Sequence, residues 1–184
     1  MAPPDDTALF RFCTACGGRL APRVLKAGEP PRLVCEACGF VCYIDPKVAV
    51  GTIIAAGDGA VVLVRRGIDP GYGKWVFPGG YVDRGEEVQG AAIREAREET
   101  GLDIRIEGLI NVYSYPRQVP VLLVYAATIV GGTMEAADEC IEIATFRQGD
   151  IPWSELAFRS TRDGLRDYFA GVLHRSAISS SPQR

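Results

Sequence analysis

Residues 80–102 read GYVDRGEEVQGAAIREAREETGL, and this stretch decides how the remainder of the chain is interpreted. Its second part contains no proline, and its apolar residues recur at helical spacing, so we predict a helix over residues 87–100 that ends at Gly101. Residues three and four apart lie on one face of a helix. Three carboxylates therefore fall within an arc of roughly 100°, those of Glu95, Glu98 and Glu99.

These glutamates overlap the apolar side of the helix instead of lying opposite to it. The same arc contains Val88, Ala91, Ala92 and Ala96. Clustered carboxylates repel each other, and they do so more strongly when they are removed from water. A hard divalent cation with oxygen ligands would neutralise them, with Mg²⁺ as the leading candidate. From this spacing alone, a solvated acidic face paired with Arg94 and Arg97 remains an open alternative.

The sequence around this helix predicts a sheet. Apolar runs bounded by turn residues indicate five strands, at 48–56, 60–65, 103–114, 119–130 and 141–146. Residues 70–85 form a glycine-rich loop before the helix. A last helix begins at Ser160 with a capping-box-like Ser-x-x-Asp start, and its apolar spacing extends to Leu173. This order predicts an α/β (α+β) fold in which helices pack on a mixed sheet.

Four of the six cysteines form two Cys-x-x-Cys pairs, separated by eighteen residues: Cys13 with Cys16, and Cys35 with Cys38. A glycine follows each pair and permits the tight turns that bring four sulfurs to one ion. The pattern predicts a closed structural Zn²⁺ site, with four buried or redox-active thiols as the alternative. Residues 26–31 read as a hairpin tip between short strands, and Cys42 and Cys140 as ordinary buried cysteines.

Length and composition restrict the organisation of the chain. The 184 residues suit one ordinary domain with a small appendage, or two small domains. The composition shifts near residue 45. We therefore expect a zinc ribbon over 8–45, a larger domain over 46–175 and a disordered tail over 176–184.

Several function classes are excluded by composition. The single histidine, His174, argues against Ser-His and Cys-His hydrolases, which need a positioned imidazole. The longest apolar stretch, 120–130, is too short to cross a bilayer. The first ten residues are acidic where a secretory signal is basic, so we expect a cytoplasmic location. The net charge of -3 argues against general nucleic-acid binding.

Written as a pattern, residues 80–102 are G-x5-E-x7-R-E-U-x-E-E-x-G-U, where U is apolar. This resembles the signature of the Nudix hydrolase family at every specified position. The resemblance implies the family's α/β/α sandwich with a mixed sheet, and a small N-terminal zinc ribbon recurs in some branches of the family. It also implies hydrolysis of a nucleoside diphosphate linked to another group, by attack of water on one phosphorus.

The resemblance also assigns roles within the motif. It implies that Glu98 and Glu99 bind Mg²⁺ or Mn²⁺, while Glu95 is either a further ligand or the base that activates water. The carbonyl of Gly79 is expected to complete the metal site. Two further residues would support these groups: Arg94 by holding the catalytic glutamates and Glu86 by fixing the loop.

Each candidate site residue outside the motif has a functional and a purely structural interpretation. Glu139 precedes a predicted strand, where the family often places a general base or extra ligand, but an ordinary exposed loop glutamate fits equally. Arg65 and Arg66 end a predicted strand and can contact phosphate or be solvated. The aromatic residues near the loop are Tyr72, Trp75, Phe77, Tyr81, Tyr113 and Tyr115. We predict that Arg65, Trp75 and Tyr115 contact the substrate, the two aromatic rings by stacking on a base, although Trp75 also fits the core.

The substrate is inferred from flanking segments. Residues 43–47 and 150–158 resemble a branch of the family that includes ADP-ribose and FAD pyrophosphatases, which implies AMP and a phosphorylated second product. The NADH branch has S-Q-P-W-P-F-P after the motif, whereas residues 114–120 lack its tryptophan and phenylalanine. An NADH- or NAD-type pyrophosphatase is one alternative, and a non-catalytic nucleotide sensor with a zinc-ribbon binding module is another. We expect a small nucleotide as partner, no membrane and no nucleic acid, with a homodimer left open.

Overall fold

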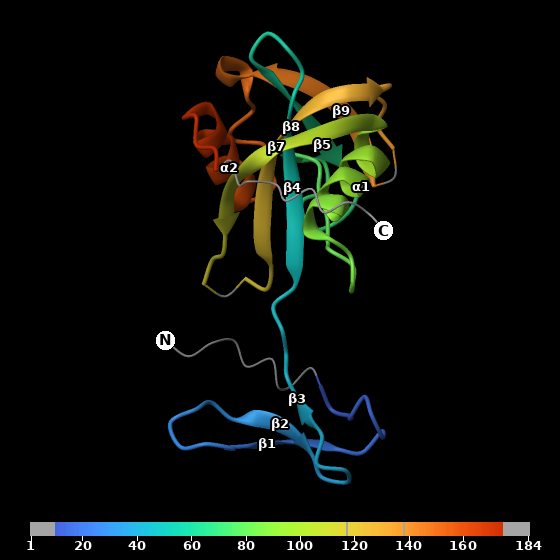
Figure 1. Cartoon of the computed structure of the whole chain (residues 1–184), viewed down its shortest axis with the longest axis vertical. Helices are drawn as coiled ribbons and strands as arrows, with labels where there is room; N and C mark the ends of the chain where they lie inside the picture. The colour runs from blue at the N-terminus through green and yellow to red at the C-terminus, as the bar shows by residue number, and fades with distance from the viewer. Residues whose placement is uncertain (1–9, 117, 138, 175–184) are drawn as a thin grey trace, which may run out of the picture. The chain divides into compact units, whose positions relative to one another are not determined.

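The computed structural model describes residues 10–116, 118–137 and 139–174, so the predicted tail over 176–184 lies outside the described residues. The chain divides into two compact units, which are described separately below (Figure 1). One contains the residues up to Pro46 together with the segment Tyr115–Val119, and the other contains the remainder.

The N-terminal unit is a three-stranded antiparallel sheet built from β1 (Leu20–Arg23), β2 (Arg32–Cys35) and β3 (Val41–Cys42). The predicted hairpin over 26–31 is confirmed, since it joins β1 to β2 in the register Leu20 to Cys35. The buried core of this unit is small, and its members are Cys13, Leu20, Leu33 and Cys35. So few apolar side chains bury too little area to hold a fold without a further cross-link.

The larger unit has a six-stranded mixed sheet in the order β6-β5-β4-β8-β7, with β9 paired to β5. Its strands are β4 (Val48–Ala55), β5 (Ala60–Arg66), β6 (Trp75–Val76), β7 (Leu102–Tyr113), β8 (Val121–Gly132) and β9 (Cys140–Arg147). The central pair β4 and β8 is parallel, whereas the other pairs are antiparallel. All five predicted strands of this unit are confirmed to within about two residues at each end, and β6 was not predicted.

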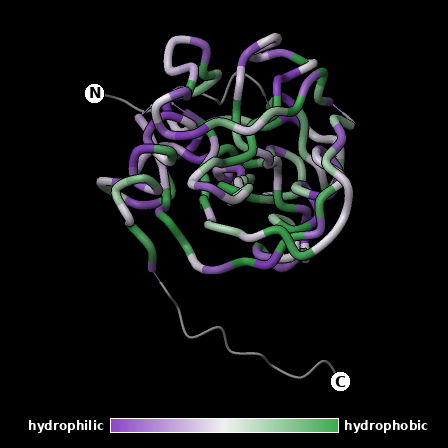
Figure 2. Tube along the Cα trace, turned by 90° about the horizontal axis from the view of Figure 1, so that it is seen from above, coloured by the Kyte–Doolittle hydropathy of each residue, from purple (hydrophilic) through white to green (hydrophobic). Residues whose placement is uncertain are grey.

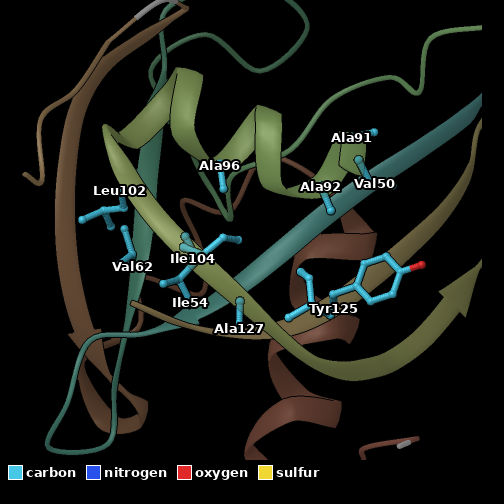
Figure 3. Close-up of a cluster of buried hydrophobic side chains, with 11 residues drawn as sticks. Val50, Ile54, Val62, Ala91, Ala92, Ala96, Leu102, Ile104, Tyr125 and Ala127 are labelled. Carbon is cyan, nitrogen blue, oxygen red and sulfur yellow. The ribbon is translucent and has the colours of Figure 1, made fainter. Parts of the chain in front are cut away.

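Two helices, α1 (Val88–Thr100) and α2 (Arg159–Phe169), lie on opposite sides of this sheet (Figure 1). Side chains of β4 point alternately to the two faces of the sheet, and both faces are covered by a helix. Val50 and Ile54 on one face pack against the alanines of α1, as Figure 3 shows. Ile53 on the other face lies against Gly164 of α2. The predicted sandwich of helices around a mixed sheet is therefore confirmed, and β4 is buried on both faces.

The last helix differs from the prediction at both ends. It begins at Arg159, its N-cap is Phe158, and no side chain caps it, so the capping-box-like start at Ser160 is wrong. It ends at Phe169, because Gly171 has a φ of 78° and turns the chain out of the helix. The apolar spacing up to Leu173 therefore continues beyond the helix itself.

Hydrophobic and hydrophilic residues are interspersed along the trace, as Figure 2 shows. In the described part of the chain, no helix is long and apolar enough to cross a membrane.

Candidate active site

The loop before α1 passes through a space that only glycine fits. A Cβ atom at Gly79 would overlap the carbonyl oxygen of Val50 and lie 2.7 Å from the Cα of Gly51. A Cβ atom at Gly80 would overlap the carboxylate of Glu95. The two glycines thus bring the loop backbone between β4 and the first carboxylate of α1.

The hydrogen bonds of this loop leave one carbonyl available. The carbonyl oxygens of Pro78 and Gly80 each accept a bond of 2.8 Å, from the backbone N–H groups of Thr52 and Val50 respectively. Across the described residues, no backbone amide donates to the carbonyl of Gly79, which lies between them. The use of the Gly79 carbonyl as a metal ligand stays a prediction.

Arg94 connects the acidic residues of the motif. Its Nε and Nη2 donate to the carboxylate of Glu86 at 2.8 and 3.0 Å. Its Nη1 donates to Glu95 at 2.8 Å and to Glu98 at 2.9 Å, and Nη2 also reaches the carbonyl of Tyr81 at 3.2 Å. These charge-assisted bonds hold the pKa of Glu86 at about 2, mainly through the Arg94 hydrogen bonds. Arg94 thus bonds to Glu86, Glu95 and Glu98, and the supporting roles of Arg94 and Glu86 in catalysis stay predictions.

Two of the three clustered glutamates are removed from water. Glu99 is only 7% exposed, and one carboxylate oxygen accepts a hydrogen bond of 2.8 Å from the N–H of Gly79. Burial raises the pKa of Glu99 to about 7, although this hydrogen bond acts in the opposite direction. Burial likewise raises the pKa of Glu95. Glu98 is more exposed, so the cluster extends from the packed base of α1 to solvent.

This donor set fits a divalent cation. Three carboxylates, those of Glu86, Glu95 and Glu98, share Arg94 as their counter-ion, and the fourth, that of Glu99, accepts its hydrogen bond from the N–H of Gly79. Glu99 receives no hydrogen bond from Arg94 and pays a desolvation cost when it is ionised. Oxygen ligands of this kind suit hard cations such as Mg²⁺. The alternative of a solvated acidic face is therefore excluded for Glu99, because its side chain is buried.

Glu139 lies in the turn before β9, with its side chain exposed. Its backbone carbonyl accepts a hydrogen bond of 2.6 Å from the N–H of Gly67. Its charge raises the pKa of Glu99, so the two carboxylates are electrostatic neighbours. This position is compatible with a base or extra ligand and equally with an exposed loop glutamate, so both predictions remain.

The two arginines that end β5 have different surroundings. Arg65 donates from Nε to the carbonyl of Gly73 at 2.7 Å and from Nη1 to Glu142 at 3.0 Å. Arg66 instead lies near enough to Glu99 for its charge to lower the pKa of that carboxyl group. Contact of Arg65 with the substrate stays a prediction, and the sequence gives no signal that separates Arg65 from Arg66.

The structure also distinguishes the aromatic candidates by their burial and by the unit to which they belong. Trp75 is 6% exposed and meets the ring of Phe146 edge-on, with centroids 5.0 Å apart, which favours its alternative role in the core. Tyr115 belongs to the unit that contains the ribbon. Tyr81, beside Gly80, is 51% exposed, and the ammonium of Lys47 lies 4.5 Å from its ring centroid. Alternation alone gave no signal that distinguished Tyr81 from its neighbours.

The four predicted zinc ligands come together in the N-terminal unit. Their sulfurs all lie within 4.8 Å of one another, with Cys16 3.3 Å from Cys38 and 3.5 Å from Cys35. Tetrahedral Zn²⁺ with bonds of about 2.3 Å places sulfurs about 3.8 Å apart, so the cluster fits this ion. Backbone N–H groups, foremost that of Cys38, lower the pKa of Cys35 to about 6 and favour its thiolate.

The two remaining cysteines differ from the prediction. Cys42 and Cys140 are half-buried and not fully buried. Cys42 packs against the small core of the ribbon, and Cys140 opens β9.

The fold and the glutamate-rich helix define a hydrolase that acts on phosphate anhydrides with the help of a divalent cation. Residues 45–164 match the family model of the NUDIX domain, and residues 11–44 match that of the Nudix N-terminal zinc ribbon. The chain therefore belongs to the Nudix hydrolase family, in the branch with an N-terminal zinc ribbon. Members of this family generally use a divalent metal.

Individual relatives support this assignment. The ADP-ribose pyrophosphatase of Methanocaldococcus jannaschii is 37% identical over 156 residues, which cover 83% of this chain and 86% of that protein. The NAD-capped RNA hydrolase NudC of Stutzerimonas stutzeri is 33% identical over 73% of this chain, but only 46% of its own length is matched. The crystal structure of a NUDIX hydrolase from Nitrosomonas europaea superposes with a TM-score of 0.82 at 33% identity, covering 88% of this chain and 91% of that one.

Proposed function

We propose that the protein is a Mg²⁺- or Mn²⁺-dependent pyrophosphohydrolase that cleaves ADP-ribose or FAD into AMP and a phosphorylated second product. The observation that carries this proposal is the 37% identity with an ADP-ribose pyrophosphatase, which extends over most of both chains. The complete set of motif acids around Arg94 supports a catalytic protein over a non-catalytic sensor.

The residues divide the chemical work among them. Glu98, Glu99 and the Gly79 carbonyl would hold the cation, which offsets the charge of the diphosphate and acidifies the attacking water. As water adds to one phosphorus and the phosphorus–oxygen bond of the anhydride breaks, a nearby carboxylate takes the water proton. Glu95 suits this role because burial raises its pKa and so makes it a stronger base than an exposed glutamate. Arg94 keeps that carboxylate aimed at the site.

Substrate discrimination must come from groups beyond the acids, because every candidate substrate carries the same diphosphate. The exposed ring of Tyr81 follows directly on Gly80, and Lys47 places a positive charge over it. A base stacked on this ring would be worth about 1–3 kcal/mol by analogy with single-stranded nucleic acids. Tyr81 thus replaces Trp75 as our leading candidate for a stacking residue.

The alternative substrate class is an NAD-type dinucleotide. The NudC relative favours it, although the matched part is less than half of that protein. Against it stands the segment 114–120, in which the tryptophan and phenylalanine of the NADH pattern are missing. We also keep the cytoplasm as the proposed location, consistent with six cysteines that form no disulfide, and a second copy of the chain as an open partner.

A substrate panel tests the proposal. ADP-ribose, FAD, NADH and a nucleoside triphosphate are compared at equal concentration with saturating Mg²⁺, and products are identified by mass spectrometry. We expect ADP-ribose or FAD to give the highest kcat/KM, with AMP as one product. The Glu98→Gln variant, purified in parallel, shows that turnover belongs to this chain and not to a contaminant. A kcat/KM at least tenfold higher for NADH or the triphosphate would contradict the substrate class while leaving the hydrolase intact.

A further inference from the structure

Arg66 is held in place by contacts that leave part of its guanidinium group unused. Its Nε donates to the carbonyl of Pro70 at 2.8 Å. Its guanidinium carbon lies 5.2 Å from the ring centroid of Phe158, which is a cation–π geometry. A loop carbonyl and an aromatic ring therefore fix the side chain from two sides.

The charges of Arg66 and Arg65 have different surroundings. Among the residues that the structure describes, no carboxylate lies within ion-pair distance of the Arg66 guanidinium, whereas Arg65 pairs with Glu142. The backbone of Arg66 adjoins the segment that leads into the motif loop, since its N–H donates to the carbonyl of Lys74 at 2.9 Å and β6 follows directly. The residue after Arg66, Gly67, is hydrogen-bonded to the backbone of Glu139. A fixed cation thus lies beside the two segments that carry Glu139 and the entry to the motif loop, and no hydrogen bond from its Nη groups is found among the described residues.

We propose that Arg66 binds a phosphate group of the substrate and that Phe158, at the N-cap of α2, is the positioning residue that holds Arg66 for it. This inference rests on the proposed diphosphate hydrolysis and names two residues beyond the motif that serve it. A planar guanidinium matches two phosphate oxygens, and restraint of the side chain before binding lowers the entropy lost on binding. Phe158 acts only through Arg66, so its contribution disappears when Arg66 is replaced.

The test uses the zinc-loaded full chain with Mg²⁺. Steady-state kinetics with ADP-ribose give KM and kcat, and calorimetry gives the Kd of α,β-methylene-ADP, a diphosphate that cannot be hydrolysed at its bridge. We expect Arg66→Gln to raise both KM and this Kd by about ten- to a hundredfold, as for the loss of a charged hydrogen bond, with a smaller change in kcat. Arg66→Lys should recover part of the loss, because it restores the charge without the planar fork.

Variants of Phe158 are tested in the wild-type protein and in the Arg66→Gln variant. Phe158→Leu, which keeps apolar volume but removes the ring, should raise KM by about three- to fivefold, and Phe158→Tyr should retain wild-type KM. In the Arg66→Gln background, Phe158→Leu should cause no further rise. Arg166→Gln is the matched control, because Arg166 also lies over an aromatic ring, that of Trp153 at 5.8 Å, and should keep wild-type KM.

Two results would overturn the inference. One is an unchanged Kd for α,β-methylene-ADP in Arg66→Gln, which would mean that Arg66 only balances the charge of the nearby glutamates. The other is an equal effect of Phe158→Leu with and without Arg66, which would mean that Phe158 only packs. If the wild type hydrolysed none of the panel substrates, the proposed function would fail, whereas the calorimetric comparison would still decide the role of Arg66.

Discussion

Replacement of Glu99 by glutamine should stabilise the protein when no magnesium is present. The folded-state pKa of Glu99 is raised from 4.5 to about 7 by burial. Folding therefore takes up a proton in this range, and the stability that the neutral acid confers is present below pH 4.5 and lost as the pH rises toward 7. At 1.36 kcal/mol per pKa unit, ionised Glu99 costs about 3 kcal/mol of unfolding free energy above pH 7. A neutral glutamine of the same shape avoids this cost.

Urea unfolding at pH 4.5, 6 and 8 measures the effect. The buffer contains neither magnesium nor a strong chelator, so that zinc stays in the ribbon. Both tryptophans, Trp75 and Trp153, belong to the larger unit, and their fluorescence therefore reports on the unit that contains Glu99. We expect Glu99→Gln to exceed the wild type by up to about 3 kcal/mol at pH 8 and to match it near pH 4.5. Glu155→Gln, at an exposed glutamate, is the control and should show no such pH dependence.

Parallel pH profiles of Glu99→Gln and the wild type would refute the argument, since the titration of Glu99 would then contribute nothing. Added Mg²⁺ provides a second comparison. It should stabilise the wild type at pH 8 but have little effect on the variant, because ligand binding stabilises only the state that binds.

Three further predictions concern the two metal sites and the core. Elemental analysis should find one zinc per chain, and Cys35→Ser should abolish it, whereas zinc-free protein with four titratable thiols would contradict the site. Glu98→Gln should lower kcat by about two orders of magnitude or more while its circular dichroism stays unchanged, because the substitution removes a charged ligand and keeps the shape; near wild-type turnover would exclude the ligand role. Gly51→Ala should cost about 1–3 kcal/mol in urea unfolding, because its Cβ would overlap the ring of Phe77; unchanged stability would show that the ring can move aside.

Local pattern was sufficient for most of the fold. The run 48–56 is apolar on both faces because helices cover both sides of β4, and α1 ends at Gly101, which has a φ of 69°. The start of α2 could not be predicted, because it depends on pairing between distant segments. Trp75 of β6 exchanges backbone hydrogen bonds with residues 155 and 157, so the chain stays extended until Phe158. A two-residue strand such as β6 carries no periodicity from which this pairing could be read.

The residues of the candidate site also fall into those that local spacing predicts and those that depend on tertiary packing. The spacing of the glutamates within one helix places them together, since helical geometry alone relates them. The choice between Arg65 and Arg66 depends on β9, which pairs with β5 and has a register shift at that point. Likewise, Trp75 and Tyr81 both fall within the predicted loop over 70–85, and only the packing of the finished sheet buries the first, in β6, and exposes the second. Contacts between elements that are distant in the sequence could therefore not be predicted from local sequence patterns.

The shared guanidinium of Arg94 has a consequence for the order in which the protein matures. Because Arg94 already bonds to three acids without a cation, the larger unit can complete its fold first and load its catalytic ion afterwards. The ribbon has the opposite dependence, since its four thiols surround a very small core and the ion itself must hold them. A chain made in a zinc-poor, magnesium-rich cell would therefore carry an assembled catalytic unit behind an unfolded N-terminus, and that N-terminus would be the first point of attack for proteases.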